Sequence, residues 1–440
     1  MKFPRSPSVE DLSEIRKELS ERDAWNVAEE LAQMEPAPRA MVFRVLPKHL
    51  ALDAFQYLEP AYQKELLDGL RDEHVRHLVE EMDPDDRARL FDEMPALVVK
   101  RLLAGLSPEQ KEMTALLLGY PEESAGRIMT PQFIKLTAGM TILQALDHFR
   151  SCATEIETHY VMPVTDEEAV LVGWVEIKDL LLAPEGATIG EVMDSDPRSV
   201  RVDDDQEDVA QLIQSADLLA VPVVDTERRV VGLVTVDDAM DVLSLEQSED
   251  LALTGASEPL RRPYFSVSIF KLARGRMIWL LLLIVASTLT VNVLNAFEDS
   301  LERAVGLALF IPLLIGTGGN AGAQSSTTIV RSMAVGDVRS RDFLRTALRE
   351  TVVGLQLGVM LGVLSLAPVW IFTGDAMALI VALTLVTICT LASLVGAMMP
   401  ILARLINVDP AVVSAPFVTT VVDATGLLVY FLIAGAILNL

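Results

Sequence analysis

Five long apolar stretches dominate the hydrophobic pattern of the C-terminal part of the chain. They cover residues 277–297, 304–330, 351–374, 376–403 and 411–440, and only the last contains a charged residue, Asp423. A helix needs about 20 predominantly apolar residues to cross the hydrocarbon core of a bilayer. The pattern therefore predicts a multi-pass protein with five membrane-spanning helices in a lipid bilayer.

The connections between these stretches predict their orientation. Basic residues precede the first stretch and fill the second connection, whereas the first and third connections are acidic or nearly uncharged. Cytoplasmic connections carry the excess of Lys and Arg. We therefore expect a cell (inner) membrane protein whose N-terminal part is cytoplasmic and whose C-terminus, after an odd number of spans, lies outside.

A period of 12 residues marks the first third of the chain. Apolar residues recur at this interval, and most are followed within a few residues by proline, which helices tolerate in their first turn. Each unit is then a short helix and a corner, too small to bury its apolar stripe alone. The recurring positions are Met34, Leu46, Leu58, Leu70, Met82, Met94, Leu106 and Leu118. Stacked units predict an acidic, all-α superhelical domain over residues 1–126.

Two related halves follow this region. Residues 161–164 (VMPV) correspond to 220–223 (AVPV), and residues 172–175 (VGWV) to 231–234 (VGLV). Each half predicts helix, strand, strand, helix, and the duplication resembles a tandem pair of CBS domains, an α/β module, over 127–190 and 191–243.

The CBS resemblance implies a regulatory sensor that binds ATP in some members. There an Asp in a [ST]-x-x-D stretch holds the ribose, and Thr235 and Asp238 match this stretch in the second half. Glu176 replaces the hydroxyl residue in the first half. A purely structural or cation-sensing module is the alternative.

Charge is divided unevenly along the chain. Of 36 basic and 62 acidic residues, 10 and 9 lie from Lys271 onward, so 26 and 53 precede it, a net charge of −27. Such an acidic surface argues against nucleic acid as a partner, because phosphate contacts need basic residues. The two cysteines make neither a disulfide framework nor a zinc spacing. We expect a connecting helix over 244–270 and a transmembrane domain over 271–440.

Asp423 is the strongest candidate for function in the membrane part. An ionised carboxylate in a span costs roughly 3 kcal/mol or more, so it should face a cavity or a cation. Pro416, Thr419, Thr420 and Asp423 share one helical face. This face offers hard oxygen ligands, which Mg²⁺ prefers. The structural alternative is a carboxylate whose hydrogen bonds are satisfied by groups on neighbouring helices.

The second apolar stretch ends in a glycine-rich run, residues 316–324 (GTGGNAGAQ). So many glycines favour an irregular backbone, which is tolerated at membrane depth only where it lines protein or water. A functional interpretation is that Gly318 and Gly319 let backbone carbonyl oxygens approach an ion and that Asn320 provides a further oxygen ligand. Close helix packing is the alternative.

Acidic residues of the soluble part are candidate ligands for regulatory cations. They lie in the N-terminal domain, in the second CBS half and in the connecting segment. A solvated acidic scaffold is the alternative. The candidates are Asp83, Asp85, Asp86, Asp92, Asp225, Asp237, Asp238, Asp241, Glu246, Glu249, Asp250 and, before the last span, Asp409.

Taken together, these motifs resemble one family along the whole chain, the MgtE-type magnesium channels. The resemblance rests on residues 318–322 (GGNAG), 409–411 (DPA) and 416–426 (PFVTTVVDATG). It implies a homodimer in which two copies of Asp423 face a central pore and coordinate a largely hydrated Mg²⁺. It also implies that Mg²⁺ binds the acidic soluble part and Asp409 and holds the pore shut.

The favoured hypothesis is a channel for passive Mg²⁺ influx, not an enzyme, that closes when Mg²⁺ neutralises mutually repelling soluble domains. An ion-coupled secondary transporter of divalent cations (Mg²⁺ or Co²⁺) is the second hypothesis, with Asp423 exchanging protons. A membrane-anchored nucleotide sensor without transport is the third.

Overall fold

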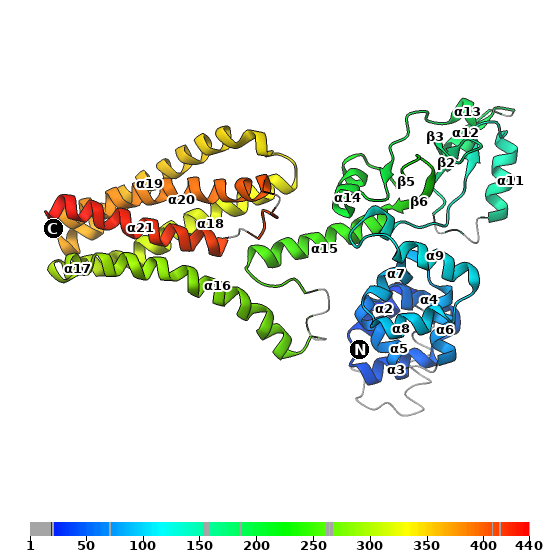
Figure 1. Cartoon of the computed structure of the whole chain (residues 1–440), viewed down its shortest axis with the longest axis horizontal. Helices are drawn as coiled ribbons and strands as arrows, with labels where there is room; N and C mark the ends of the chain where they lie inside the picture. Colours follow the sequence, from blue (N-terminus) through cyan, green and yellow to red (C-terminus); the bar gives the residue numbers. More distant parts are fainter. Residues whose placement is uncertain are drawn as a thin grey trace. The chain divides into compact units, whose positions relative to one another are not determined.

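Figure 1 shows the chain as a computed structural model. Its described residues form two compact units, residues 1–246 and 247–440. The described residues are 19, 22–69, 72–152, 156, 158–184, 186–260, 264, 267–406, 408–412 and 415–439.

Short helices build the N-terminal domain, which confirms its predicted all-α class. Pro36, Pro60, Pro84 and Pro108 begin α3, α5, α7 and α9, in the first turn, where a missing N–H costs nothing. Because these prolines are 24 residues apart, the structural unit is a pair of helices, and the 12-residue period marks one member of the pair. Leu70 lies outside the described residues. The bounds are α2 (Ala24–Ala32), α3 (Pro36–Val45), α4 (Lys48–Gln56), α5 (Pro60–Gly69), α6 (Asp72–Glu81), α7 (Pro84–Asp92), α8 (Ala96–Leu103) and α9 (Pro108–Leu118).

Two buried arginines link helices of this domain by hydrogen bonds to backbone carbonyls. Arg39 Nε donates to the carbonyl of Leu31 at 2.8 Å, and Arg87 Nε donates to the carbonyl of Val79 at 2.6 Å. Both arginines follow a helix-starting proline by three residues and are buried. They satisfy carbonyls near the C-terminus of a preceding helix that lack a partner within that helix.

The CBS pair contains two three-stranded sheets, one in each half. In both sheets the first strand is parallel to the second, and the second is antiparallel to the third. The strands are β1 (Leu136–Thr137), β2 (Val161–Thr165), β3 (Leu171–Glu176), β4 (Val200–Arg201), β5 (Ala220–Val224) and β6 (Val230–Thr235). The helices are α10 (Ala125–Ile128), α11 (Ile142–Cys152), α12 (Ile177–Leu182), α13 (Ile189–Val192), α14 (Gln206–Ser215) and α15 (Val236–Thr254).

The two halves interlock through the segments that open them. Thr130, at the start of the first half, pairs with Leu233 on β6 of the second, and Asp194 pairs with Trp174 on β3 of the first. Gly232 leaves room for this crossing, because a Cβ atom there would lie 2.9 Å from the Thr130 carbonyl oxygen.

The helix α15 belongs to both the CBS pair and the connecting segment. It runs without a break from Val236 to Thr254, so the boundary expected between residues 243 and 244 falls inside one helix.

Five helices among the described residues are long and apolar enough to cross a membrane. In the C-terminal unit, α18 packs against both α20 and α21, and α19 packs along α20. The long helices are α16 (Ile269–Ala296), α18 (Ile311–Ala334), α19 (Phe343–Thr373), α20 (Asp375–Leu405) and α21 (Ala415–Leu438). Shorter elements are α17 (Glu298–Arg303), η2 (Val305–Phe310) and η3 (Ser340–Asp342).

Candidate functional site

Asp423 lies on α21 and faces the backbone of α18. Its Oδ1 atom is buried and meets no hydrogen-bond partner among the described residues. A Cβ atom on Gly319 would lie 3.6 Å from this oxygen. Burying a carboxylate without a partner is costly, and a cation is the partner that offsets this cost. The arrangement suits a cation that passes or binds beside Gly319.

The glycine run does not form the irregular backbone that its composition predicts. Residues 316–324 lie inside the continuous helix α18. Gly318 faces Val422, where a Cβ atom would lie 3.1 Å from Cγ1, and Gly322 faces Val418, at 2.9 Å. The prediction of an irregular backbone is wrong because the glycines are used for close approach between helices.

Two threonines lie one turn before Asp423 on α21. The hydroxyls of Thr419 and Thr420 both donate to the carbonyl of Pro416, each at 2.9 Å. That carbonyl is therefore engaged, whereas each hydroxyl oxygen keeps lone pairs that can accept a hydrogen bond from ion-bound water. Asn320, on α18, is exposed.

A second group of candidates consists of Glu249 and Asp250 on α15 and Asp409 before α21. Burial raises the pKa of Asp250, on α15, and the nearby charges of Asp409 and Glu249 raise it further, whereas Arg331 lowers it. Asp409 accepts a hydrogen bond from the Ala411 amide at 2.8 Å. The charges of Glu249, Asp409 and Arg331 thus all act on Asp250.

The N-terminal domain and the second CBS half share a third group. Burial raises the pKa of Asp83 to about 6, and the charges of Asp86 and Asp237 add to this. Burial likewise raises the pKa of Asp238 to about 7, although a hydrogen bond from Thr235 opposes the shift. Both carboxyls therefore hold protons more strongly than an exposed Asp.

The remaining acidic candidates lie apart from these groups or have partners of their own. Asp85 is buried in the first turn of α7. Asp92 forms an ion pair with Arg127. Asp225 accepts backbone hydrogen bonds in the turn between β5 and β6, and Glu246 accepts one from Gln206 at 2.9 Å.

The two residues of the nucleotide motif are in contact. Thr235 Oγ1 donates to Asp238 Oδ2 at 2.6 Å, and the charges of Arg89 and Asp86 also act on Asp238. The side chain predicted to hold a ribose is therefore shared with the N-terminal domain.

No group of three or more His, Cys, Asp or Glu side chains converges on a single point within the described ranges. Mg²⁺ does not require such a cage, since it is usually held by one or two carboxylates and keeps several waters. The single carboxylate of Asp423 and the groups of carboxylates that include Asp250 and Asp238 fit this weaker requirement.

Sequence reasoning missed the cations that accompany these carboxylates. Arg89, Arg127 and Arg331 each lie beside a candidate acid. Only the Arg89–Asp86 pair, three residues apart on one helix, follows a spacing that sequence can reveal. In the C-terminal unit, Ser325 Oγ lies 2.7 Å from Glu350 Oε2 and 2.8 Å from the carbonyl oxygen of Ser393, and its one proton can be donated to either. This link joins α18, α19 and α20.

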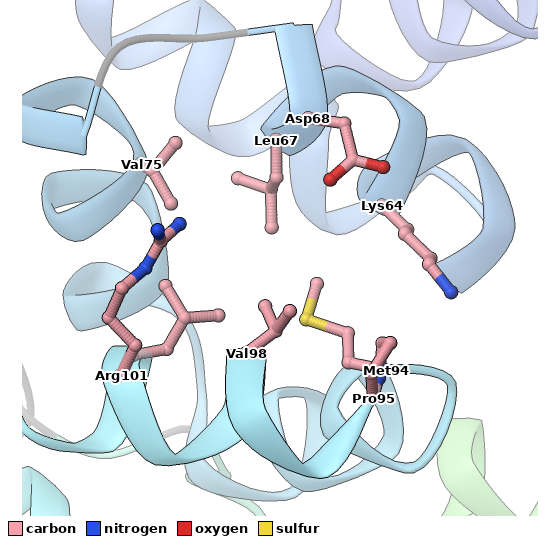
Figure 2. Close-up of a pocket in the computed structure, with 9 residues that line it drawn as sticks. Lys64, Leu67, Asp68, Val75, Met94, Pro95, Val98 and Arg101 are labelled. Carbon is pink, nitrogen blue, oxygen red and sulfur yellow. The ribbon is translucent and has the colours of Figure 1, made fainter.

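A pocket of about 240 Å³ opens in the N-terminal domain between α5 and α8 (Figure 2). Leu67, Val98 and Met94 give it apolar walls, and Lys64 and Asp68 lie at its edge. One carboxylate beside Lys64 and Arg101 is a poor site for a divalent cation, so the pocket is not a candidate cation site.

Comparison with known proteins finds separate matches for the N-terminal domain, the CBS pair and the membrane part. Residues 311–433 match the family model described as a divalent cation transporter, residues 10–123 match the MgtE intracellular N domain, and residues 125–186 and 189–245 match the CBS domain. The five apolar helices and the divalent cation transporter match define a multi-pass membrane transporter.

Curated relatives specify the family. The magnesium transporter MgtE of Thermus thermophilus is 38% identical over 97% of this chain and 95% of its own length. MgtE of Bacillus subtilis is 31% identical over 95% of this chain and 94% of its own length. The chain belongs to the MgtE family of magnesium transporters.

Solved structures also resemble the soluble part. The cytosolic domain of the Mg²⁺ channel MgtE, crystallised in complex with ATP, is 35% identical and covers 52% of this chain and 93% of that one, with a TM-score of 0.49.

Proposed function

We propose that this chain is a Mg²⁺ channel that conducts Mg²⁺ passively into the cell and closes when internal Mg²⁺ rises. The unpartnered carboxylate oxygen of Asp423, facing Gly319 inside the membrane part, carries this proposal. Further oxygen atoms come from Thr419 and Thr420, which precede Asp423 in the sequence, and from Asn320, which follows Gly319. Together they suit an ion that keeps most of its water.

The pore is proposed to form in a homodimer. One carboxylate neutralises only half the charge of Mg²⁺, so Asp423 from each of two chains is needed for a divalent site. A membrane potential of about 100 mV contributes roughly 2.3 kcal/mol per charge, or about 4.6 kcal/mol for Mg²⁺. Inward flow then needs no nucleotide hydrolysis.

Regulation is proposed to act through the acidic soluble part, which we place in the cytoplasm, with the C-terminus outside. At low Mg²⁺ the carboxylates repel one another and the soluble domains of the two subunits separate. At high Mg²⁺ the ion bridges them. The proximity of Asp250 to Asp409 supports a closing step in which Mg²⁺ joins the connecting helix to the segment before α21.

ATP is proposed as a second regulatory ligand of the CBS pair, held through Thr235 and Asp238. Their hydrogen bond keeps the two motif residues adjacent. Isothermal titration with ATP, using the wild type and Asp238→Ala, tests this proposal. Equal binding by both proteins would remove Asp238 from the nucleotide site.

The pore proposal is tested by recording currents from the purified protein in planar bilayers. We expect Asp423→Asn to abolish Mg²⁺ current and Asp423→Glu to retain part of it, because only the second keeps a negative charge. Thr425→Val is the matched control, since Thr425 is on the same helix but is exposed.

Normal currents through Asp423→Asn would contradict the pore proposal. Proton-coupled Mg²⁺ flux without currents would instead favour an ion-coupled secondary transporter. A covalently linked dimer with one Asp423→Asn subunit tests the shared site: full current through it would contradict a pore built from two carboxylates.

A further inference from the structure

A single carboxylate on α19 links three helices of the C-terminal unit. Glu350 Oε2 lies 2.7 Å from Ser325 Oγ on α18, and the same hydroxyl oxygen lies 2.8 Å from the carbonyl oxygen of Ser393 on α20. Ser325 and Ser393 are buried, whereas Glu350 is partly buried. The hydroxyl has one proton for two acceptors, so the three groups form one short polar chain across these helices.

Glu350 lies where the charged part of α19 gives way to its apolar part. Arg345 and Arg349 precede it, and no Lys, Arg, Asp or Glu follows it before Asp375. An ionisable side chain next to a membrane-spanning stretch is costly unless a polar group pairs with it, so Glu350 is a candidate for function. Because one partner is a carboxylate, its hydrogen bond to Ser325 is about twice as strong as a bond between neutral groups.

Ser325 continues the glycine-lined face of α18. Gly318, Gly322 and Ser325 are separated by four and three residues, so they lie on the same side of the helix. At Gly322 the backbones of α18 and α20 are in direct contact, because a Cβ atom on Gly396 would overlap the Gly322 carbonyl oxygen. These glycines set how closely the two helices approach. They have no side chains that interlock, so they resist a shift of α18 along its axis only weakly.

The same part of α18 faces the helix that carries Asp423. A Cβ atom on Gly322 would lie 2.9 Å from Val418 Cγ1, and one on Gly319 would lie 3.6 Å from Asp423 Oδ1. Ser325 follows Gly319 by six residues, or about 9 Å along the helix axis. A shift of α18 along its axis would therefore change which backbone atoms lie beside the carboxylate. A directional hydrogen bond at Ser325 opposes such a shift.

We propose that Glu350 is a positioning residue for the ion site. Through Ser325 it fixes the position of α18 along its axis, and α18 in turn holds Gly319 beside Asp423. The inference rests on the proposed function and deepens it, because Glu350 acts on the ion through another residue and not by direct contact. The contact with Ser393 ties the same point to α20, so α18 is held from two sides.

Ion selectivity is the property that such a shift changes first. Mg²⁺ requires near-ideal octahedral geometry, whereas Ca²⁺ accepts a variable number of oxygen ligands in flexible arrangements. A site whose spacing has loosened should therefore lose its preference for Mg²⁺ over Ca²⁺ before it loses transport. Loss of packing alone would reduce the amount of folded protein and would leave the ratio of the two ions unchanged.

Uptake of Mg²⁺ and of Ca²⁺ into liposomes that contain the full chain tests the proposal. We expect Glu350→Ala and Ser325→Ala each to lower the Mg²⁺/Ca²⁺ uptake ratio by about tenfold, because a misplacement of about 1 Å costs up to about 100-fold in an organised site. Glu350→Gln should remain within about twofold of the wild type, since its amide oxygen still accepts a hydrogen bond. The double variant Glu350→Ala/Ser325→Ala should match each single variant, because both changes remove the same interaction.

Ser326→Ala is the matched control. Ser326 is the next residue of α18 and is also buried, but its Oγ atom meets no hydrogen-bond partner in the part of the chain that the structure describes. Removing this hydroxyl breaks no hydrogen bond, so the uptake ratio should stay at the wild-type value. The ratio is measured on protein that has folded and inserted, which makes it independent of any loss of stability.

A wild-type uptake ratio in Glu350→Ala would overturn the proposal, as would a change of the same size in Ser326→Ala. The ratio does not depend on whether transport is passive or ion-coupled, so failure of the channel proposal is distinguishable. If Asp423→Asn transports normally while Glu350→Ala changes the ratio, the proposed ion site falls and Glu350 acts elsewhere. If only Asp423→Asn is affected, the ion site stands and the positioning role falls.

Discussion

At the scale of single residues, the surroundings of Asp423 depend on a residue without a side chain. A Cβ atom on Gly319 would lie 3.3 Å from Thr419 Cγ2 and 3.6 Å from Asp423 Oδ1. These are tight or ordinary contacts, so a methyl group fits only by filling the space beside the carboxylate. That space is where the waters of a hydrated ion would lie under the proposed function.

We therefore expect Gly319→Ala to lower Mg²⁺ flux into liposomes by roughly fivefold, equivalent to about 1 kcal/mol. Gly316→Ala is the matched control, because a Cβ atom there meets nothing within 4 Å. It lies on the same helix and should keep wild-type flux. Equal fluxes in the two variants would show that Gly319 does not border the ion path.

At the scale of elements, a stripe of glycines sets the distance between α19 and α20. Gly354, Gly358 and Gly362 follow one another at four-residue spacing and are buried. A Cβ atom on Gly358 would lie 2.5 Å from Val386 Cα and 2.8 Å from its carbonyl oxygen. Small residues at this spacing let helix backbones approach closely in membranes.

Gly358→Ala should therefore destabilise the membrane part by about 1–3 kcal/mol, because backbone must move to admit the methyl group. Thermal unfolding of the detergent-solubilised protein measures this effect. Gly435→Ala is the control, since a Cβ atom on Gly435 meets nothing within 4 Å. There the better helix propensity of alanine should leave stability equal or slightly higher, and a loss as large as that of Gly358→Ala would refute the packing argument.

The connecting helix gives a second prediction at this scale. Asp250 is partly buried near Asp409 and Glu249, so a bridging Mg²⁺ would relieve repulsion among the three. Asp250→Asn should raise the Mg²⁺ concentration that half-closes the channel by about tenfold, close to 1.4 kcal/mol. Glu167→Gln, an exposed acid in the turn before β3, should not shift it. Unchanged inhibition in Asp250→Asn would exclude the bridge.

At the scale of the whole molecule, charge is the main variable, since the chain has a formal net charge of −26. The acids gathered between α7 and α15 have raised pKa values, about 6 for Asp83 and about 7 for Asp238. A carboxyl whose pKa is raised by burial binds protons more strongly in the folded chain than in the unfolded chain. Its contribution to the stability of this region is therefore greatest at low pH and is lost as the pH rises through these values.

In EDTA, we expect α7 amides to exchange faster at about pH 8 than at about pH 6, after correction for the intrinsic exchange rate. Asp238→Asn should reduce this difference, because the amide does not titrate. A difference of the opposite sign, or one unaffected by Asp238→Asn, would contradict the assignment.

Local patterns predicted much of the fold. Five long apolar stretches predicted five helices, because a helix needs such a stretch to cross the hydrocarbon core of a bilayer. The regular recurrence of Met34, Leu46 and Leu58 revealed short stacked helices. The duplicated motifs around Pro163 and Pro222 revealed paired sheets. Each of these signals is carried by residues close together in the chain.

Pairings across the chain could not be predicted in this way. Buried Arg39 and Arg87 bond to carbonyls of earlier helices, and the spacing of apolar residues does not reveal these contacts. Composition alone suggested an irregular glycine run, whereas α18 is a continuous helix whose glycines lie against Val418 and Val422 of α21.

Sequence by itself determined the division into acidic helical repeats, a duplicated CBS module and a five-helix membrane part. It also singled out Asp423 as the candidate cation ligand, because burying a charge among apolar residues has few structural explanations. Only the tertiary structure decided which groups lie next to Asp423 and next to the other candidate carboxylates. Arg89 and Asp241, 152 residues apart, illustrate why: electrostatic partners are chosen by distance in space, which hydrophobic periodicity along the chain does not encode.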